Sequence, residues 1–372
     1  MNRLFVTGVA AALVAFTTSA QAIEYISSVA SGPKSAGTVG THLFIDKVEA
    51  ASNGNIKFKK FVGGTLLSFS ATWAGIRDGV ADVGWTLPQY SPAEFPNGKL
   101  IGDLAMVGTD GYAMAFTVTE FVLMNCADCL AEHYAQKQVF TGTGSTPPYR
   151  LIMVPKVVTA ADMKGVKIRS GGPVWNRWAA HFGAVPVVVA SDDTYQALTS
   201  GQIEGTIHPI SNFKSYNYWD KARNLNMLPM GTFHSMSLLS WNQNTWSKMS
   251  TADRRMMLDL APVAHIRTVL HYEMQEDEAL IEGPKFKLAV TEPSPEFAAA
   301  HAEWVKADLK NVISGNQNVR DADKKVAQFI QIYDKWNKAV QPIRKDEAAL
   351  VALMQKEIMA KVDAASYGVL SR

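Results

Sequence analysis

Residues 161–172 read Ala-Asp-Met-Lys-Gly-Val-Lys-Ile-Arg-Ser-Gly-Gly, a short strand-like run that ends in Arg169 and continues into a glycine-rich turn. This order places a guanidinium group at the edge of a predicted sheet, where its planar fork can pair with both oxygens of a carboxylate. A surface arginine in an ordinary salt bridge is the alternative interpretation. Arg169 is therefore the first candidate for a ligand-binding residue.

The segment lies within an alternating series of strands and helices, and a similar series precedes it. Strands are expected at 23–29, 56–62, 80–85, 149–154, 166–170 and 185–189, and helices at 38–51, 70–78, 174–182 and from Asp192 or Asp193, as a possible cap, to Ser200. Because strand-helix-strand units form right-handed crossovers, each series predicts a mainly parallel sheet. Two such units predict two lobes, with a ligand cleft beyond the carboxyl ends of the strands.

The rest of the chain becomes helical in composition from Thr251 onward, with breaks near 283–284, 293–295 and 315. We expect long C-terminal helices that pack across one or both lobes.

The N-terminus has the pattern of a secretory signal peptide. Arg3 precedes the uncharged apolar run 4–16, and Ala20-Gln-Ala22 is a small-x-small cleavage site. The apolar run, at roughly 13 residues, is too short for a membrane anchor, which needs roughly 20. We therefore expect cleavage after Ala22 and a soluble exported chain that begins at Ile23.

Charge and motifs exclude several classes of function. The formal net charge of +2 becomes +1 when residues 1–22, with one arginine and no acid, are removed, so neither nucleic acid nor an anionic membrane is an expected partner. No Gly-x-Ser-x-Gly, His-Glu-x-x-His or phosphate-loop motif occurs, and a Ser-His-Asp triad is neither supported nor opposed by the sequence. We expect no enzyme activity, no cofactor and no metal site.

The two cysteines, Cys126 and Cys129, stand three residues apart. In an oxidising compartment a structural disulfide is favoured. A redox pair would lie at the start of a helix, whereas these residues fall inside the predicted helical stretch 114–137. A metal site would need a second cysteine or histidine pair at ligand spacing.

The chain from about Ile23 to Met249 resembles the substrate-binding receptors of tripartite ATP-independent periplasmic (TRAP) transporters. In that family a strand close to Met-Lys-Gly-x-Lys-Ile-Arg carries the arginine that clamps the ligand carboxylate, which matches Arg169. Further blocks agree in order and spacing: Ala50-Ala-Ser-Asn-Gly54, Gly63-Gly-Thr-Leu66, Asp78-Gly-Val-Ala-Asp82, Gly183-Ala-Val-Pro186, and Tyr195-Gln-Ala-Leu198 before Gly201-Gln-Ile-Glu-Gly205.

The resemblance implies an α/β, two-lobed periplasmic-binding-protein fold with mixed sheets, a ligand cleft between the lobes and long C-terminal helices. Lobe I is expected at 23–147 plus about 237–285, and lobe II, with the C-terminal helices, at 148–236 plus about 286–372. Some members dimerise through their long helices, so the chain is expected to be a monomer or a homodimer.

Further site residues follow from the resemblance. Arg150 has the placement of a second arginine that contacts the ligand in some members. His208 stands where sialic-acid-binding members have a ligand-contacting Asn, and it either donates to a ligand oxygen or is a satisfied core histidine. Trp85 and Leu87 match the end of a strand that lines the cleft.

The same comparison bears on the class of ligand. The sialic-acid-binding members have a Glu close to Leu87, and loss of that polar group favours a less polyhydroxylated ligand. Phe233 and His234 fall in a segment that passes near the cleft in the family, and each either lines the cleft or belongs to the core.

The implied function is capture of a small organic acid and its delivery to membrane permease subunits. An aromatic or otherwise apolar carboxylate is favoured over a sugar acid or a C4-dicarboxylate. The alternatives are a receptor of an ATP-driven importer or a sensor kinase with the same fold, or a periplasmic enzyme.

Overall fold

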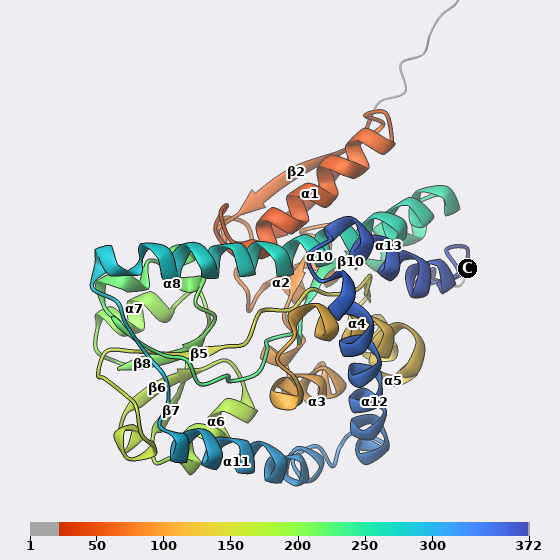
Figure 1. Cartoon of the computed structure of the whole chain (residues 1–372). Helices are drawn as coiled ribbons and strands as arrows, with labels where there is room; N and C mark the ends of the chain where they lie inside the picture. Colours follow the sequence, from red (N-terminus) through yellow and green to blue (C-terminus); the bar gives the residue numbers. More distant parts are fainter. Residues whose placement is uncertain (1–21, 371–372) are drawn as a thin grey trace, which may run out of the picture.

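The first of two sheets contains the N-terminal strand of the computed structural model, which describes residues 22–370 (Figure 1). Its strand order is β2-β1-β3-β10-β4, with β1 (Ile23–Val29), β2 (Ile56–Val62), β3 (Val83–Thr86), β4 (Gln138–Val139) and β10 (Ser237–Asn242). Strand β1 is parallel to β2 and β3, whereas β10 is antiparallel to β3 and β4. The predicted signal peptide lies, except for Ala22, outside the described residues.

The second sheet has the order β11-β9-β5-β8-β6-β7. Its strands are β5 (Arg150–Met153), β6 (Lys167–Ser170), β7 (Val185–Val188), β8 (Gly205–His208), β9 (Asn224–Asn226) and β11 (Ala289–Thr291). Strand β6 is parallel to β7 and β8, and β5 is antiparallel to β8 and β9. The predicted α/β fold with two lobes and mixed sheets is confirmed.

Short helices fill the connections around the sheets. They are α1 (Ala36–Ala51), α2 (Thr72–Arg77), α3 (Pro96–Asp103), α4 (Gly111–Glu120), α5 (Ala127–Ala135), α6 (Pro173–His181), α7 (Thr194–Thr199), α8 (Asn212–Ser215) and α9 (Gln243–Lys248). Helix α1 ends where Asn53 and Gly54 adopt positive φ angles of 52° and 76°, which reverses the chain into β2. Asp193 stands at the N-cap position of α7, one of the two positions predicted, but its side chain makes no capping hydrogen bond.

The long helix α10 (Thr251–Glu282) joins the two lobes. It packs against α1 beside the first sheet and against α8 beside the second, and Figure 1 shows it running across both. Its buried face includes Leu258, His265 and Tyr272. Because one continuous helix touches both lobes, their relative movement requires bending or sliding along this contact.

The last helices form a second connection between the lobes. Helix α11 (Pro295–Ser314) packs against α6 through Phe297 and Trp178, and α12 (Ala322–Val340) packs against α4 through Trp336 and Phe116. Helix α13 (Glu347–Glu357) then packs on α10. The sequence analysis assigns α12 to lobe II, whereas α12 packs on α4, which belongs to the predicted lobe I. The predicted lobe boundaries in this part of the chain stay a prediction.

The helical stretch predicted at 114–137 is broken at Cys126, so its prediction as one helix was wrong. A π-helical turn at Phe121–Asn125 follows α4, and Cys126 is the N-cap of α5, with its Sγ accepting from the Cys129 amide at 3.1 Å. The two cysteines form a disulfide and are both buried. A helix start is where a redox pair would lie, but burial of both sulfurs favours the structural role.

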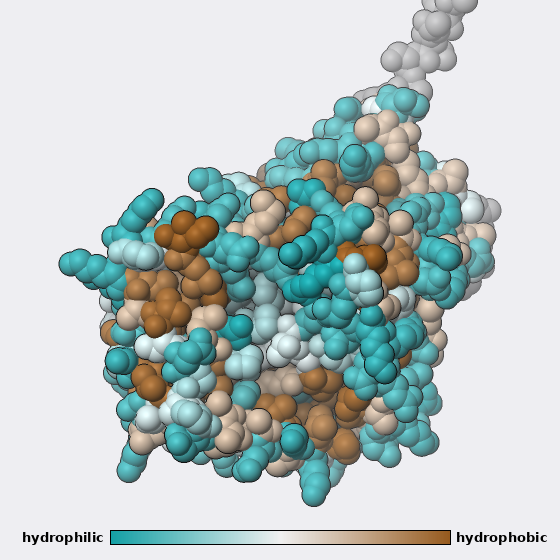
Figure 2. Space-filling view, in the orientation of Figure 1, coloured by the Kyte–Doolittle hydropathy of each residue, from teal (hydrophilic) through white to brown (hydrophobic). Residues whose placement is uncertain are grey.

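The surface in Figure 2 is predominantly hydrophilic, with hydrophobic residues in separate patches at the left and at the bottom of the view. Within residues 22–370 no single helix has the length and apolar composition to cross a membrane. One bent pair, Gly111–Asn125 with Ala127–Ala135, meets that criterion only when the two are taken together, and its axes differ by 86°. Most residues of α4 are buried in the core.

Candidate functional site

A narrow cavity of about 40 Å³ lies between the lobes, near the carboxyl ends of β3 and β8. Half of its 14 lining side chains are aromatic, and they come from both lobes: Phe69, Trp85, Tyr90, Tyr149, Tyr216, Phe233 and Tyr272. Thr146, Ser191, His208 and Asn212 add polar groups, and no lysine, arginine, aspartate or glutamate lines the cavity itself. An apolar planar ligand fits such walls better than a highly charged one.

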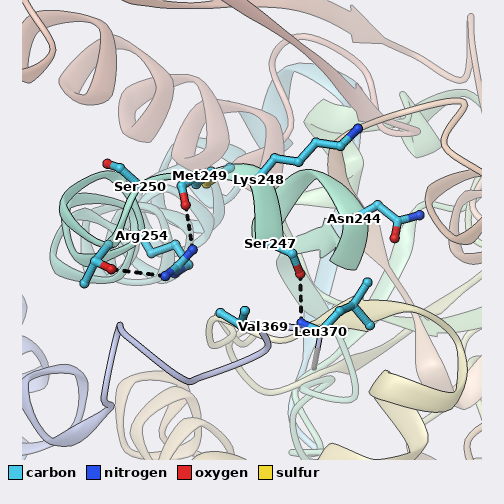
Figure 3. Close-up of a pocket in the computed structure, with 9 residues that line it drawn as sticks. Asn244, Ser247, Lys248, Met249, Ser250, Arg254, Val369 and Leu370 are labelled. Carbon is cyan, nitrogen blue, oxygen red and sulfur yellow. Dashed lines mark hydrogen bonds between the residues drawn. The ribbon is translucent and has the colours of Figure 1, made fainter. Parts of the chain in front are cut away.

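A larger depression of about 920 Å³ lies elsewhere, between α9, the start of α10 and the last described residues (Figure 3). Its buried cation, Arg254, already donates to the carbonyl oxygens of Met249 at 2.6 Å and Ala364 at 2.8 Å. The Leu370 amide donates to Ser247 Oγ at 3.0 Å across the same surface. The polar groups of this depression are used to hold the last described residues against α9 and α10. We therefore do not take the depression as the candidate site.

Arg169 lies in β6 with only 1% of its surface exposed. Its Nε donates to the Val189 carbonyl oxygen at 2.9 Å, Nη1 donates to His208 Nε2, and Nη2 donates to Tyr90 Oη at 3.1 Å. No hydrogen-bond partner of Arg169 within the described part of the chain is a carboxylate. The surface salt bridge considered for this residue is therefore wrong. Asp192 interacts with Arg169 electrostatically but forms no hydrogen bond with it, and a buried guanidinium without a directly paired carboxylate favours an anionic ligand.

His208 holds Arg169 through its ring. An arginine can only donate, so His208 Nε2 accepts and the ring proton lies on Nδ1. Nδ1 is 3.0 Å from Thr206 Oγ1 and 3.1 Å from Tyr218 Oη. Burial, with the charge of Arg169 added, lowers the pKa of His208 well below its ordinary value. Because both nitrogens already have protein partners, the geometry favours a satisfied histidine over a donor to the ligand.

Trp85, Leu87 and Phe233 all line the cavity, together with His208. Phe233 lies nearly parallel to Tyr149 and Trp175, with ring centroids 6.3 and 6.2 Å away. The structure thus brings these four predicted residues together in one place. Their contact with a ligand stays a prediction.

His234 belongs to the core rather than to the cavity. It is 1% exposed, and its Nε2 lies 2.9 Å from the Ile101 carbonyl oxygen. Burial lowers its pKa to about 4, against opposing hydrogen bonds to the backbone. The core interpretation of His234 therefore holds.

Arg150 is next to the site but does not line the cavity. It pairs with His208 across β5 and β8, and its Nε and Nη1 have no hydrogen-bond partner within residues 22–370. Burial lowers the pKa of Arg150, against the charges of Glu276 and Glu292. Burial also raises the pKa of Glu276 on α10 to about 8. The predicted ligand contact of Arg150 stays a prediction.

The lobes touch each other around the cavity. Gln89 Nε2 from lobe I donates to the Gly171 carbonyl oxygen of lobe II at 3.0 Å. Arg177 of α6 pairs with Asp103 of α3 at 3.3 Å and with Asp308 of α11 at 2.7 Å. These bonds join the two lobes directly, as expected for a closed arrangement.

Several cavity residues were not selected from the sequence. Tyr90 follows β3 by a few residues. Its closeness in sequence to Trp85 was the signal that could have identified it as a cavity residue. Tyr272 lies in α10, where helical spacing identifies a buried face but not the lobe that the face meets. Ser191 follows β7 in a loop whose course no local pattern predicts, and Asn212 is the first residue of the short helix α8 after β8.

Comparison with known proteins connects this geometry to a family. Residues 26–316 match the model of bacterial extracellular solute-binding protein family 7, called DctP. A solute-binding protein of Sulfitobacter sp. (strain NAS-14.1) is 26% identical over 236 residues, which is 63% of this chain and 69% of the relative. Other curated relatives are matched over 36% to 63% of their length.

Two solved structures share the fold over nearly their whole length. A TRAP solute-binding protein of Rhodoferax ferrireducens T118, in complex with copurified benzoate, has a TM-score of 0.77, 19% identity, and coverage of 86% of this chain and 99% of its own. A marine metagenome TRAP solute-binding protein specific for aromatic acids, with 3-hydroxybenzoate, has a TM-score of 0.76, 18% identity, and coverage of 85% and 99%.

The resemblance inferred from the sequence is confirmed. Members of the family are periplasmic receptors that bind small organic acids and work with membrane subunits of a transporter, and they are not enzymes. The chain belongs to bacterial extracellular solute-binding protein family 7, the family of the TRAP transporter receptors.

Proposed function

We propose that the chain captures a small aromatic or otherwise apolar monocarboxylate, holds its carboxylate with Arg169, and delivers it to the membrane permease of a TRAP transporter. The observation that carries this proposal is the buried guanidinium of Arg169, which makes no hydrogen bond or salt bridge to a carboxylate within residues 22–370 and adjoins an aromatic cavity through His208 and Tyr90.

The donor count of Arg169 supports a carboxylate. A guanidinium has about five N–H groups, and the three hydrogen bonds to Val189, His208 and Tyr90 use one each. One N–H therefore remains on each Nη, which is the pair that an end-on carboxylate needs. Each charge-assisted bond of this kind contributes about 1.5–3 kcal/mol.

The walls of the cavity favour a ligand with one negative charge and an apolar body. The lining contains no charged side chain, and Arg169 is the cation that hydrogen-bonds two of its residues, His208 and Tyr90. Leu87 and Phe233 offer contact without hydrogen bonds, and offset or edge-on aromatic pairs each add about 0.5–1.5 kcal/mol. The fold neighbours that bind benzoate, 3-hydroxybenzoate and mandelate agree with this ligand class.

The size of the cavity implies a hinge. At about 40 Å³ it is far smaller than the roughly 300 Å³ of a pocket for a drug-sized ligand. A ligand with one aromatic ring enters only if the lobes separate, and their return buries it. Movement about α10 and the α11–α12 connection is consistent with this cycle.

A thermal-shift screen tests the proposal. Benzoate, 3-hydroxybenzoate and mandelate are each compared with succinate, glucuronate and the neutral amide benzamide. At about one hundred times its dissociation constant, a true ligand adds about 2.7 kcal/mol to the free energy of unfolding, which is a shift of several degrees. A best ligand without a carboxylate would contradict the clamp, and a best ligand among succinate and glucuronate would contradict the apolar ligand class.

A further inference from the structure

The turn Pro88–Tyr90, which follows β3, reaches across the cleft to the strand that carries Arg169. Tyr90 Oη accepts from Arg169 Nη2 at 3.1 Å, and the adjacent Gln89 binds the Gly171 carbonyl oxygen. The Gln89 amide packs closely on Gly172, where a Cβ would lie 1.5 Å from Gln89 Nε2. Two consecutive residues of lobe I thus contact the end of β6 in lobe II.

The bond between Tyr90 and Arg169 does not use the O–H of Tyr90 as a donor. Arginine only donates, so Tyr90 Oη is the acceptor in their bond, and a phenol has one O–H to donate. The bond to Arg169 is the hydrogen bond that Tyr90 Oη makes within residues 22–370. The O–H rotates about the C–O bond, so its proton can turn toward an anion beside the guanidinium.

The ring of Tyr90 places this hydroxyl beside the ligand space. Tyr90 lines the cavity, and its ring packs edge-on against Phe233 at 6.3 Å between centroids. The nearest charged group on the other lobe is Arg169, while His208 is held neutral by burial. No carboxylate of the cavity lining competes for the Tyr90 proton.

We propose that Tyr90 contacts the ligand and completes the carboxylate site from the opposite lobe. Its O–H donates to the carboxylate oxygen that Arg169 Nη2 holds. This inference rests on the proposed function, and it adds that the ligand charge is bound from both lobes at once. Closure then depends on the carboxylate itself and not only on the apolar ring, so that a neutral analogue is held in the open form.

The variant Tyr90→Phe tests this role, because it keeps the ring and its packing on Phe233 and removes only the oxygen. Calorimetric titration with benzoate is expected to give a dissociation constant about tenfold to a hundredfold higher than that of the unmodified chain. Tyr195→Phe is the matched control, since it removes a hydroxyl that binds Asp220 on the surface of the same protein at 3.3 Å. The control is expected to bind benzoate as the unmodified chain does.

A spectroscopic measurement separates contact from structural support. Benzoate labelled with carbon-13 in the carboxyl group gives an isotope-shifted carboxylate stretch in the bound state. A hydrogen bond from Tyr90 changes the frequency of that stretch, so the band is expected to move in Tyr90→Phe and to stay in place in Tyr195→Phe. A merely structural role would weaken binding and leave the band of the bound fraction unchanged.

The possible failures are distinct. If neither benzoate nor any other acid of the screen binds the unmodified chain, the proposed function is wrong, and the inference about Tyr90 is wrong with it. If benzoate binds the unmodified chain and folded Tyr90→Phe with equal affinity, or with an unchanged carboxylate band, only the inference about Tyr90 is overturned.

Discussion

Replacement of His208 by asparagine is expected to leave Arg169 with an acceptor while removing a buried titrating group. Burial, reinforced by the charge of Arg169, lowers the pKa of His208 well below its usual value. The folded chain therefore keeps the ring neutral, whereas the unfolded chain protonates it near pH 6.5. Stability from this depressed pKa is fully present above about pH 6.5 and is lost as the pH falls below it.

The size of the effect follows from the proton that only the unfolded state binds. At pH 5 that state gains about RT ln(1 + 10^1.5), or about 2 kcal/mol, per buried histidine. Other buried histidines have pKa values lowered to about 4, and they contribute equally to both proteins: His133, His234, His265 and His301. Between pH 7 and pH 5 the free energy of unfolding should therefore fall by about 2 kcal/mol less in His208→Asn than in the unmodified chain.

Urea unfolding at the two pH values, followed by circular dichroism, measures this difference. His181→Asn is the matched control, because it removes a histidine from the exposed end of α6. The control should lose as much stability on acidification as the unmodified chain. An equal loss in His208→Asn and in the unmodified chain would show that His208 titrates in the folded state, and would refute its assignment as a neutral acceptor.

Two further predictions concern closure and the disulfide. Gly172→Ala is expected to displace the Gln89 amide and break its hydrogen bond to the Gly171 carbonyl oxygen, because the added methyl group would lie 1.5 Å from Gln89 Nε2, the end of a flexible side chain. Calorimetric titration should then give a dissociation constant for the best acid about twofold to tenfold higher, and an unchanged constant would oppose a role of this contact in closure. Reduction of Cys126–Cys129 should lower the free energy of unfolding by only about 2 kcal/mol, since the closed loop is short. Urea unfolding with and without reductant checks this value, and loss of folding on reduction would contradict it.

Six of the eleven strands in residues 22–370 were predicted from the sequence, whereas β4, β8, β9, β10 and β11 were not. The segments 23–29 and 56–62 have the bounds that the structure gives to β1 and β2. Alternation of side chains and the break at Asn53-Gly54 are local signals, and local signals decide these elements. The position of Arg169 near the end of a strand was predicted for the same reason, because the strand and the glycine turn are adjacent in the chain.

The break at Cys126 was not predictable from pattern. Residues on both sides of it pack into the core, as Phe116, Phe121 and Cys129 show. An apolar run of this kind looks the same whether the helix continues or turns by 86°. The bend is therefore set by packing and not by a local stop signal.

The outline of the site was only partly predictable. The ends of strands gave three of the cavity residues, namely Trp85, Leu87 and His208. Tyr272 instead reaches the cavity from α10, whose position depends on contacts with both lobes. Arg150 was expected at the ligand from the resemblance; in the structure it does not line the cavity, and its charge interacts with that of Glu276 on α10. Side-chain direction at the start of a strand depends on such neighbours.

The central claim is that Arg169 holds the carboxylate of the ligand, and calorimetric titration of Arg169→Met with the best acid from the screen tests it most directly. Methionine keeps much of the buried volume and removes both free N–H groups, so affinity should fall by at least about a hundredfold. Arg77→Met, which removes an exposed arginine paired with Asp78, should leave affinity unchanged. A folded Arg169→Met protein that binds the acid with the affinity of the unmodified chain would contradict the carboxylate clamp.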